Sequence, residues 1–432
     1  MIKSRFTWPI VPAIDLAPHF TRAAGGPVDE RVITVVGVGA GGWDGLPETS
    51  RAALREADVL LGSARQLALV PDGSAERVAW PSPLLPALPG LVERYAGRAV
   101  AVLASGDPMF YGIGSTLAGL VGPERLRVLP HPSSASLACA RLGWPLERTD
   151  VVSFVGRPAE TLNALVAPGR RVLVLGAGRE APMVVAALLT GRGFGSSRMT
   201  VLSDLGGADE AAAHGVASHW SGPAASALTV VAVECVPGPD AAPLPRVAGL
   251  PDDAYEHDGQ ITKSEVRAVT LARLAPLPGE LLWDVGAGSG SVAIEWARAH
   301  PSCAAVAVES RADRVARIGR NAKALGVPGV RVVEGRAPDA LDGLPRPDAV
   351  FIGGGLTTPG LLDRCWDALQ PGGRLVANAV TLESEVTVAE YRRTRGGELV
   401  RLGVERAAPL GGFTGWRPAM PVTVWTARKD TL

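Results

Sequence analysis

The sequence predicts an α/β protein of two domains, each with a mainly parallel β-sheet. Three observations lead to this prediction. The chain has 432 residues, which exceeds the size of one ordinary domain. Short apolar runs alternate with stretches at helical spacing in both halves. A proline-rich stretch, residues 236–253, separates the two alternating regions and suits neither a helix nor a strand.

The first half contains a series of apolar runs that we expect to be strands. Residues 1–28 precede them and are expected to form an arm, while residues 29–236 form the first domain. Stretches at helical spacing lie between the runs, for example residues 48–57 and 182–193. The expected strands are residues 31–39, 99–105, 125–130, 150–156, 170–176, 198–206 and 227–235.

The α/β alternation restarts after the proline-rich linker, for which we take residues 237–256. Residues 257–432 form the second domain, and its last apolar run, 420–428, alternates like an antiparallel edge strand. The expected helices are 263–277, 291–300 and 311–326, and strands are expected at 281–286 and 304–310.

Composition excludes several classes of protein. Hydrophobic residues make up 47% of the chain and charged residues 20%, so a packed core is expected. The 43 basic and 43 acidic side chains balance, which argues against nucleic acid or an anionic membrane as a partner. The four cysteines lie far apart, so we expect neither a metal site nor disulfides. With no long apolar span and no signal-peptide pattern, a cytoplasmic protein is expected.

A glycine-rich loop in the second domain carries the strongest chemical signal. Asp284-Val-Gly-Ala-Gly-Ser-Gly290 lies between an expected strand and an expected helix. Glycines let the backbone approach a ligand closely, and the helix N-terminus offers free N–H groups. Glu309, at the end of the next strand, can accept hydrogen bonds from a ribose diol.

This loop favours S-adenosylmethionine over a dinucleotide. A dinucleotide fingerprint needs a sixth-position glycine, where this chain has Ser291. Asp284 would repel a pyrophosphate but attract the ammonium group of a methionine. A turn of purely structural importance is the remaining alternative.

Several segments of the second domain resemble the decarboxylating precorrin methyltransferases of cobalamin biosynthesis. They are residues 262–267, 283–297, 334–341 and 351–355. The resemblance implies a Rossmann-like class I methyltransferase fold with a mostly parallel sheet. It also implies methylation at C15 and loss of carbon dioxide from the C12 acetate. The implied contacts to the methyl donor are Thr262, Asp284, Gly286, Ala287, Gly288, Ser289, Gly290, Glu309 and Ala337. At Arg336 the sequence departs from the family, in which an aspartate is common.

Turns in the first domain also indicate a ligand site. Residues 35–42 match a G-x-G-x-x-G pattern, but Trp43 to Pro47 delay the next helix, so a tight turn is favoured over a nicotinamide site. A Gly-Asp-Pro turn at residues 106–108 follows a strand and exposes backbone groups and the Asp107 carboxylate. Ser133 and Ser134 open a helix, where capping alone is the alternative role.

The order of these motifs over residues 30–236 resembles the tetrapyrrole methylase family. The resemblance implies two α/β subdomains that bind S-adenosylmethionine in the cleft between them, and methylation at C5. The family's usual Gly-x-Gly-Pro-Gly turn is altered, because Ala40 replaces the proline. The implied donor contacts are Gly39, Ser105, Gly106, Asp107, Phe110, Ser133 and Ser134.

The tandem of both resemblances predicts a bifunctional C-methyltransferase of corrin-ring biosynthesis, with one methyl donor per domain and no metal. A tetrapyrrole substrate carries many carboxylates, so basic residues should line its site. A single-activity methyltransferase with a degenerate first domain, acting on another small molecule or a macromolecule, remains the alternative. We also expect self-association into a homo-oligomer. The substrate-binding candidates are Lys263, Arg267, Arg336, Arg406, Trp416 and Arg417, the last two on an expected loop.

Overall fold

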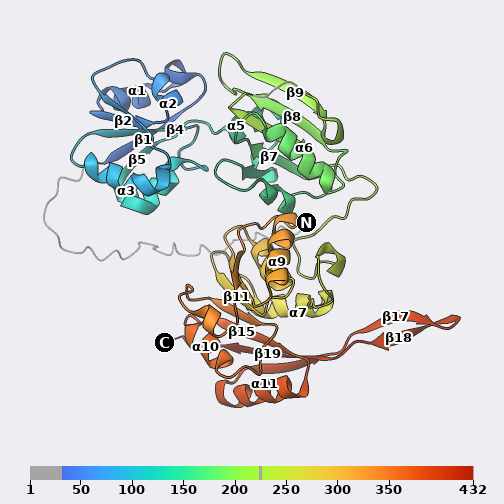
Figure 1. Ribbon diagram of the computed structural model, residues 1–432. Coiled ribbons are helices and arrows are strands. Elements are labelled where there is room, and N and C mark those ends of the chain that lie inside the picture. Colours follow the sequence, from blue (N-terminus) through green and yellow to red (C-terminus); the bar gives the residue numbers. More distant parts are fainter. Residues whose placement is uncertain (1–31, 223–225, 432) are drawn as a thin grey trace, which may run out of the picture.

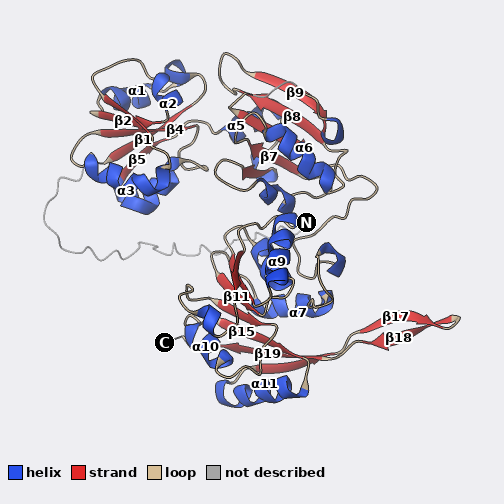
Figure 2. Cartoon of the chain, viewed as in Figure 1, coloured by secondary structure: helices blue, strands red, loops and turns tan. Residues whose placement is uncertain are grey.

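The chain folds into three successive α/β units, two in the first half and one in the second (Figures 1 and 2). The computed structural model describes residues 32–222 and 226–431. The predicted N-terminal arm, residues 1–28, lies outside these residues. Within the described ranges, no helix has both the length and the apolar character needed to cross a bilayer.

The first unit has a five-stranded, fully parallel sheet. The strand order is β3 (Glu76–Ala79), β2 (Val59–Gly62), β4 (Val100–Ser105), β1 (Ile33–Val38) and β5 (Leu126–Leu129). Its helices are α1 (Glu48–Arg55), α2 (Ala64–Ala68), α3 (Leu84–Arg94) and α4 (Ile113–Val121). Val35 and Val36 are both fully buried although they point to opposite faces, because helices cover both sides of the sheet.

The second unit has a mainly antiparallel sheet, which corrects the prediction of mainly parallel sheets throughout the chain. The order is β6 (Asp150–Ser153), β7 (Arg171–Leu175), β10 (Thr229–Glu234), β8 (Arg198–Ser203) and β9 (Ala211–Val216). Only β6 and β7 pair in parallel. Its helices are α5 (Ser134–Leu142) and α6 (Ala181–Gly191). Alternating apolar runs show that strands exist but not which way they run.

The third unit has a seven-stranded sheet in which all strands run in the same direction except β19, which is antiparallel to both of its neighbours. The order is β13 (Arg331–Glu334), β12 (Ala304–Glu309), β11 (Leu281–Val285), β14 (Ala349–Ile352), β15 (Arg374–Ala379), β19 (Val422–Arg428) and β16 (Glu398–Leu402). The helices are α7 (Ser264–Leu274), α8 (Ser291–Ala299), α9 (Ala312–Ala324), α10 (Leu361–Ala368) and α11 (Leu382–Arg395). Strand β19 is antiparallel as predicted, but it lies between β15 and β16 and is not an edge strand.

A β-hairpin extends from the third unit, where the sequence predicted a loop. Strands β17 (Glu405–Leu410) and β18 (Phe413–Pro418) pair only with each other, and the hairpin projects away from the sheet (Figure 1). Gly411 at its tip has a φ of +60°, a conformation that glycine adopts without strain.

The end of the predicted linker packs onto the third unit. Leu250 and Tyr255 belong to its hydrophobic core, with exposed fractions of 1% and 4%. The backbone N–H groups of Gly249 and Leu250 donate to the buried Glu295 carboxylate over 2.6 and 3.1 Å. The third unit therefore begins structurally before residue 257.

The second and third units touch at the C-terminal end of α9. The Asn163 amide, at the 3-10 helix Ala159–Ala164, donates to the Lys323 carbonyl over 3.1 Å. Arg192 donates to the Ala324 carbonyl over 3.3 Å. Both acceptors are carbonyls of the last turn of the helix, so the end of α9 is joined directly to the second unit.

Candidate functional site

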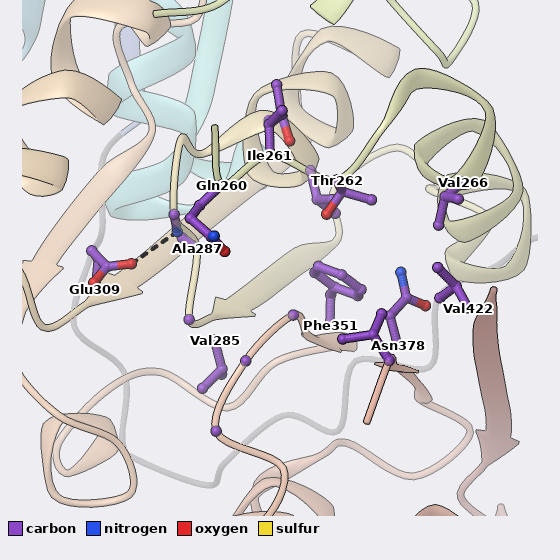
Figure 3. Close-up of a pocket in the computed structure, with 18 of the residues that line it drawn as sticks. Gln260, Ile261, Thr262, Val266, Val285, Ala287, Glu309, Phe351, Asn378 and Val422 are labelled. Atoms are coloured by element: carbon purple, nitrogen blue, oxygen red, sulfur yellow. Dashed lines mark hydrogen bonds between the residues drawn. The ribbon is translucent and has the colours of Figure 1, made fainter. Parts of the chain in front are cut away.

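A cavity of about 590 Å³ lies at the carboxyl edge of the third sheet, where open α/β sheets place their ligands. Figure 3 shows residues that line it, from the ends of several neighbouring strands and from the segment before α7. Of the predicted donor contacts, six line this cavity: Thr262, Gly286, Ala287, Gly288, Glu309 and Ala337.

The glycine loop turns sharply over the end of β11. Gly286, Gly288 and Gly290 have φ values of +72°, +59° and +76°, which residues with a Cβ rarely adopt. A Cβ on Gly286 would lie 3.0 Å from the Gly354 backbone nitrogen. Side chains at these positions would therefore reduce the space of the cavity above the loop.

Glu309 joins the loop to the end of β12. Glu309 is 5% exposed. One oxygen of its carboxylate accepts the Gly288 N–H over 2.9 Å, the bond drawn in Figure 3. The other oxygen accepts the N–H groups of Ser310 and Arg311 over 2.8 and 3.0 Å. These bonds hold the Glu309 side chain at the cavity wall, where its oxygens can accept further hydrogen bonds.

Asp284 lies beneath the loop rather than in the cavity wall. It is 1% exposed, and its Oδ2 accepts the Ala293 N–H over 2.9 Å. Its Oδ1 is buried without a hydrogen-bond partner among the described residues. Burial raises the pKa of Asp284 to about 7, and the nearby Glu309 adds to the shift. Asp284 therefore does not line the cavity, and its direct contact to the methyl donor stays a prediction.

Ser289 and Gly290 belong to the glycine loop but do not line the cavity. Ser289 is 2% exposed. A Cβ on Gly290 would meet the Ile318 side chain at 2.7 Å, so this glycine serves the packing of the loop on α9.

Arg267 is a structural residue, which corrects its prediction as a substrate contact. It is fully buried, and its Nε donates to Glu295 over 2.5 Å. Further donations reach the backbone carbonyls of Thr262 and Leu250. With its charge paired in the core, Arg267 cannot reach a ligand in the cavity.

Four basic residues line the cavity. Lys263, Arg336 and Arg406 were predicted, while Arg314, which pairs with Asp258 over 2.9 Å, was not. Lys263 lies 3.4 Å from Asp252, and Arg406 pairs with Glu265 of α7. Arg336 is exposed and forms no ion pair among the described residues. The cavity therefore has basic groups suited to carboxylates.

Trp416 and Arg417 do not belong to this cavity, in contrast to the prediction. Both lie on β18 of the projecting hairpin, and Trp416 is 73% exposed. The glycines of residues 411–415 suggested a loop, but Gly411 and Gly412 form the turn of a hairpin and Gly415 lies within β18.

Sequence reasoning missed Phe351 and Asn378, which line the cavity at the ends of β14 and β15. Figure 3 shows them side by side. The Asn378 amide nitrogen donates to the Thr270 hydroxyl over 3.0 Å. Their place at strand ends was the available signal, because neighbouring parallel strands end at one edge.

A second cavity, of about 640 Å³, lies between the first and second units. Residues of both units line it, for example Ser105 from the first and Ser153 from the second. All seven predicted donor contacts of the first domain line this cavity: Gly39, Ser105, Gly106, Asp107, Phe110, Ser133 and Ser134.

The floor of this cavity is formed where β1, β4 and β5 end. A Cβ on Gly37 would lie 2.1 Å from the Gly106 carbonyl oxygen, and one on Gly39 would lie 2.5 Å from the His131 ring. The Gly106 N–H donates to the Val38 carbonyl over 3.0 Å. Glycine is therefore required for the close approach of these loops.

The polar residues of this cavity are partly engaged by their own backbone. Asp107 accepts the Met109 N–H over 2.8 Å, and Ser133 caps α5 by accepting the Ser136 N–H over 3.0 Å. Arg65 and Gln66 of α2 also line the cavity and were not predicted. Strand β2, which precedes them, was not among the expected strands, so the sequence did not indicate that Arg65 and Gln66 follow a strand end.

The chain matches two families at the residues that build the two cavities. The tetrapyrrole (corrin/porphyrin) methylases match residues 32–219, and the precorrin methyltransferase domain matches residues 253–429. Fold and site thus define a fusion of two methyltransferase domains.

Individual relatives narrow this class further. The chain is 48% identical over 400 residues to a decarboxylating precorrin-6Y C(5,15)-methyltransferase of Sinorhizobium sp, covering 92% of this chain and 96% of the relative. It therefore belongs to the family of decarboxylating precorrin-6Y C(5,15)-methyltransferases.

Two shorter relatives match part of the chain. A probable cobalt-precorrin-6B C(15)-methyltransferase (decarboxylating) of Methanosarcina acetivorans is 31% identical over 177 residues, 40% of this chain and 95% of the relative. The crystal structure of the C-terminal domain of precorrin-6Y C5,15-methyltransferase from Rhodobacter capsulatus is 49% identical and covers 43% of this chain and 100% of that chain, with a TM-score of 0.41.

Proposed function

We propose that this chain is a bifunctional, S-adenosylmethionine-dependent methyltransferase that converts precorrin-6Y to precorrin-8. The first domain methylates C5. The second methylates C15 and removes carbon dioxide from the C12 acetate. The observation that carries the proposal is the presence of two separate cavities of about 590 and 640 Å³, each built from one of the two matched domains.

The residues of the C-terminal cavity fit a methyl donor. The glycine loop gives a floor free of side chains, and Glu309 offers carboxylate lone pairs to a ribose diol. The Asp284 Oδ1 is buried below the loop without a partner among the described residues, and an ammonium group bound above it would favour the ionised form of this carboxyl. Ala337, Thr262 and Gly354 complete the wall.

The N-terminal cavity also fits such a donor, through different chemistry. Small residues at the ends of β1 and β4 leave backbone surface open between the first and second units. Ser105, Asp107 and Ser134 provide polar groups, and Phe110 provides an apolar face. We infer one donor molecule for each cavity.

When bound, S-adenosylmethionine supplies a methyl group on a positively charged sulfur, which electron-rich ring carbons attack directly. The task of the chain is to hold both reactants in line and to exclude water. In the C-terminal cavity we assign substrate carboxylates to Lys263, Arg336 and Arg406. Phe351 and Val422 give the apolar wall that keeps the reacting carbon dry.

When the bond to the carboxylate breaks, the conjugated macrocycle can accept the electron pair that the departing carbon dioxide leaves behind. The remaining CH2 group then takes up a proton from water and becomes a methyl group. An acetate placed against the apolar wall, away from the basic residues, loses its hydration. Such desolvation disfavours the charged carboxylate and favours its loss.

Self-association and a cytoplasmic location are part of this proposal. The hairpin exposes Leu410, Phe413 and Trp416 with fractions of 69%, 83% and 73%. Exposed apolar groups of this size mark interaction sites, and we assign the hairpin to contacts with a second copy of the chain.

Equilibrium dialysis with labelled S-adenosylmethionine tests the two-site proposal on the full chain. We expect two equivalents bound in the wild type and one in Glu309→Ala, which lacks the carboxylate of the C-terminal cavity. A single equivalent in the wild type, lost in Glu309→Ala, would favour a single-activity methyltransferase with a degenerate first domain.

A further inference from the structure

Arg65 brings an unpaired positive charge to the N-terminal cavity. It lies on α2, its side chain is exposed, and it lines the cavity beside Ser105. It forms no ion pair with a carboxylate of the described residues, and its one hydrogen bond goes to the Ser105 hydroxyl, 2.9 Å away. Desolvation by the surrounding groups lowers the pKa of Arg65, while the charge of Asp204 acts in the opposite direction.

The hydrogen bonds around Ser105 fix which way its hydroxyl works. Gln66 is 7% exposed, and its amide oxygen accepts the Ser63 N–H over 2.8 Å. Its amide nitrogen must therefore be the group that meets Ser105, over 3.0 Å. Ser105 Oγ thus accepts from both Gln66 and Arg65.

A serine hydroxyl has two acceptor lone pairs and one proton. Both lone pairs of Ser105 are engaged, so its only remaining role is to donate. No acceptor for this proton occurs among the described residues, and the side chain is exposed at the cavity. The guanidinium of Arg65 has five N–H donors, of which one is used here.

We propose that Arg65 and Ser105 form a carboxylate-binding subsite in the N-terminal cavity. One carboxylate oxygen would accept from the guanidinium and the other from the Ser105 hydroxyl, because a carboxylate only accepts and carries the opposite charge. Gln66 is the positioning residue that keeps the hydroxyl proton directed outward. The subsite rests on the proposed function of the first domain. Its carboxylate belongs either to the methionine part of the donor or to an acetate or propionate of the tetrapyrrole.

Calorimetric titration of the full chain distinguishes the two sources. The Glu309→Ala background restricts the binding signal to the N-terminal cavity, and the ligands are S-adenosylmethionine and its decarboxylated analogue. If the donor supplies the carboxylate, Arg65→Gln weakens the binding of S-adenosylmethionine about tenfold to hundredfold, as expected for a charged hydrogen bond. The affinity for the decarboxylated analogue then stays unchanged. Arg65→Lys should restore part of the affinity.

If the tetrapyrrole supplies the carboxylate, Arg65→Gln leaves both donor affinities unchanged. The substitution then weakens the binding of precorrin-6Y by a similar factor. This affinity is measured by fluorescence titration at equilibrium with S-adenosylhomocysteine present. The matched control is Arg127→Gln, an exposed arginine of β5 outside the cavity, which should change neither affinity.

Unchanged affinity of Arg65→Gln for both the donor and precorrin-6Y would overturn the subsite. Failure of the proposed function looks different. It appears as one donor equivalent in the wild type, and the precorrin-6Y titration still decides whether Arg65 binds a carboxylate.

Discussion

At the scale of single residues, Asp284 has an unusual environment beneath the C-terminal cavity. Its carboxyl group is buried beneath the glycine loop and has one hydrogen bond and one unpartnered oxygen. Burial raises its pKa to about 7, above the ordinary value of 3.8. The native protein therefore holds a proton there that the unfolded chain releases at a lower pH.

Asp284→Asn should change the pH dependence of stability. In the wild type, the contribution of this group to stability is full below the unfolded pKa and is lost as the pH rises from about 4 to 7. The variant lacks this loss, so its free energy of unfolding relative to the wild type should rise by up to about 1.4 kcal/mol per pH unit. Urea unfolding at pH 5, 6 and 7 measures the difference. Asp342→Asn, an exposed control, should show no such trend, and a pH-independent difference for Asp284→Asn would contradict the raised pKa.

Arg267→Ala should act on stability, since it leaves the buried Glu295 charge without its partner. We expect a loss of about 3–5 kcal/mol in the free energy of unfolding. Arg273→Ala removes an exposed ion pair with Glu398 and should cost at most about 1 kcal/mol. Equal small losses for both variants would show that Arg267 is not a core residue.

The sequence could locate Glu309 but not the role of Arg267. Glu309 is recognisable because it ends a strand at a fixed distance from a glycine loop. Arg267 lies on a helix within a recognised motif, but its partner Glu295 lies 28 residues away, and only the packing of α7 on α8 brings them together.

At the scale of elements, the meeting of β1 and β4 controls the N-terminal cavity. Gly37→Ala would place a Cβ 2.1 Å from the Gly106 carbonyl oxygen, which is backbone and cannot turn aside. We expect a stability loss of about 1–3 kcal/mol from overpacking, and loss of one donor equivalent in equilibrium dialysis. Gly45→Ala meets nothing within 4 Å and should keep both equivalents. Two bound donor equivalents in Gly37→Ala would contradict this account of the cavity floor.

The hairpin offers a separate test. Replacing Leu410, Phe413 and Trp416 together by serine should lower the molar mass in sedimentation equilibrium toward the 44.6 kDa of one chain. Leu85→Ser changes a residue of α3 that is 64% exposed and should leave the mass unchanged. A wild type that is already monomeric would contradict the proposed self-association.

Elements were predictable where burial on both sides gives a long apolar run, as in β1, β11 and β12. Strand β9 was missed because its sequence, Ala-Ala-Ala-His-Gly-Val, has few β-branched residues and is mostly exposed. The position of β19 inside the sheet was also hidden. Its outer neighbour β16 has no fully buried residue, and pairing between strands that lie apart in the sequence leaves little local signal.

At the scale of the whole molecule, two cavities of different construction occur in one chain. The first lies between two α/β units, and the second lies at the edge of a single sheet. The bonds from Asn163 and Arg192 to the end of α9 join the domains directly. The order of motifs along the chain predicted both cavities. The contact between Asn163, Arg192 and the end of α9 could not be predicted, because the two surfaces that meet there carry no motif.

Mass spectrometry of the product formed from precorrin-6Y and S-adenosylmethionine tests the central claim most directly. The account predicts a product that has gained two methyl groups and lost one carbon dioxide. It further predicts that Glu309→Ala abolishes the loss of carbon dioxide. A wild-type product with one added methyl group, or with its carboxylate count unchanged, would contradict the assignment of two activities to this chain.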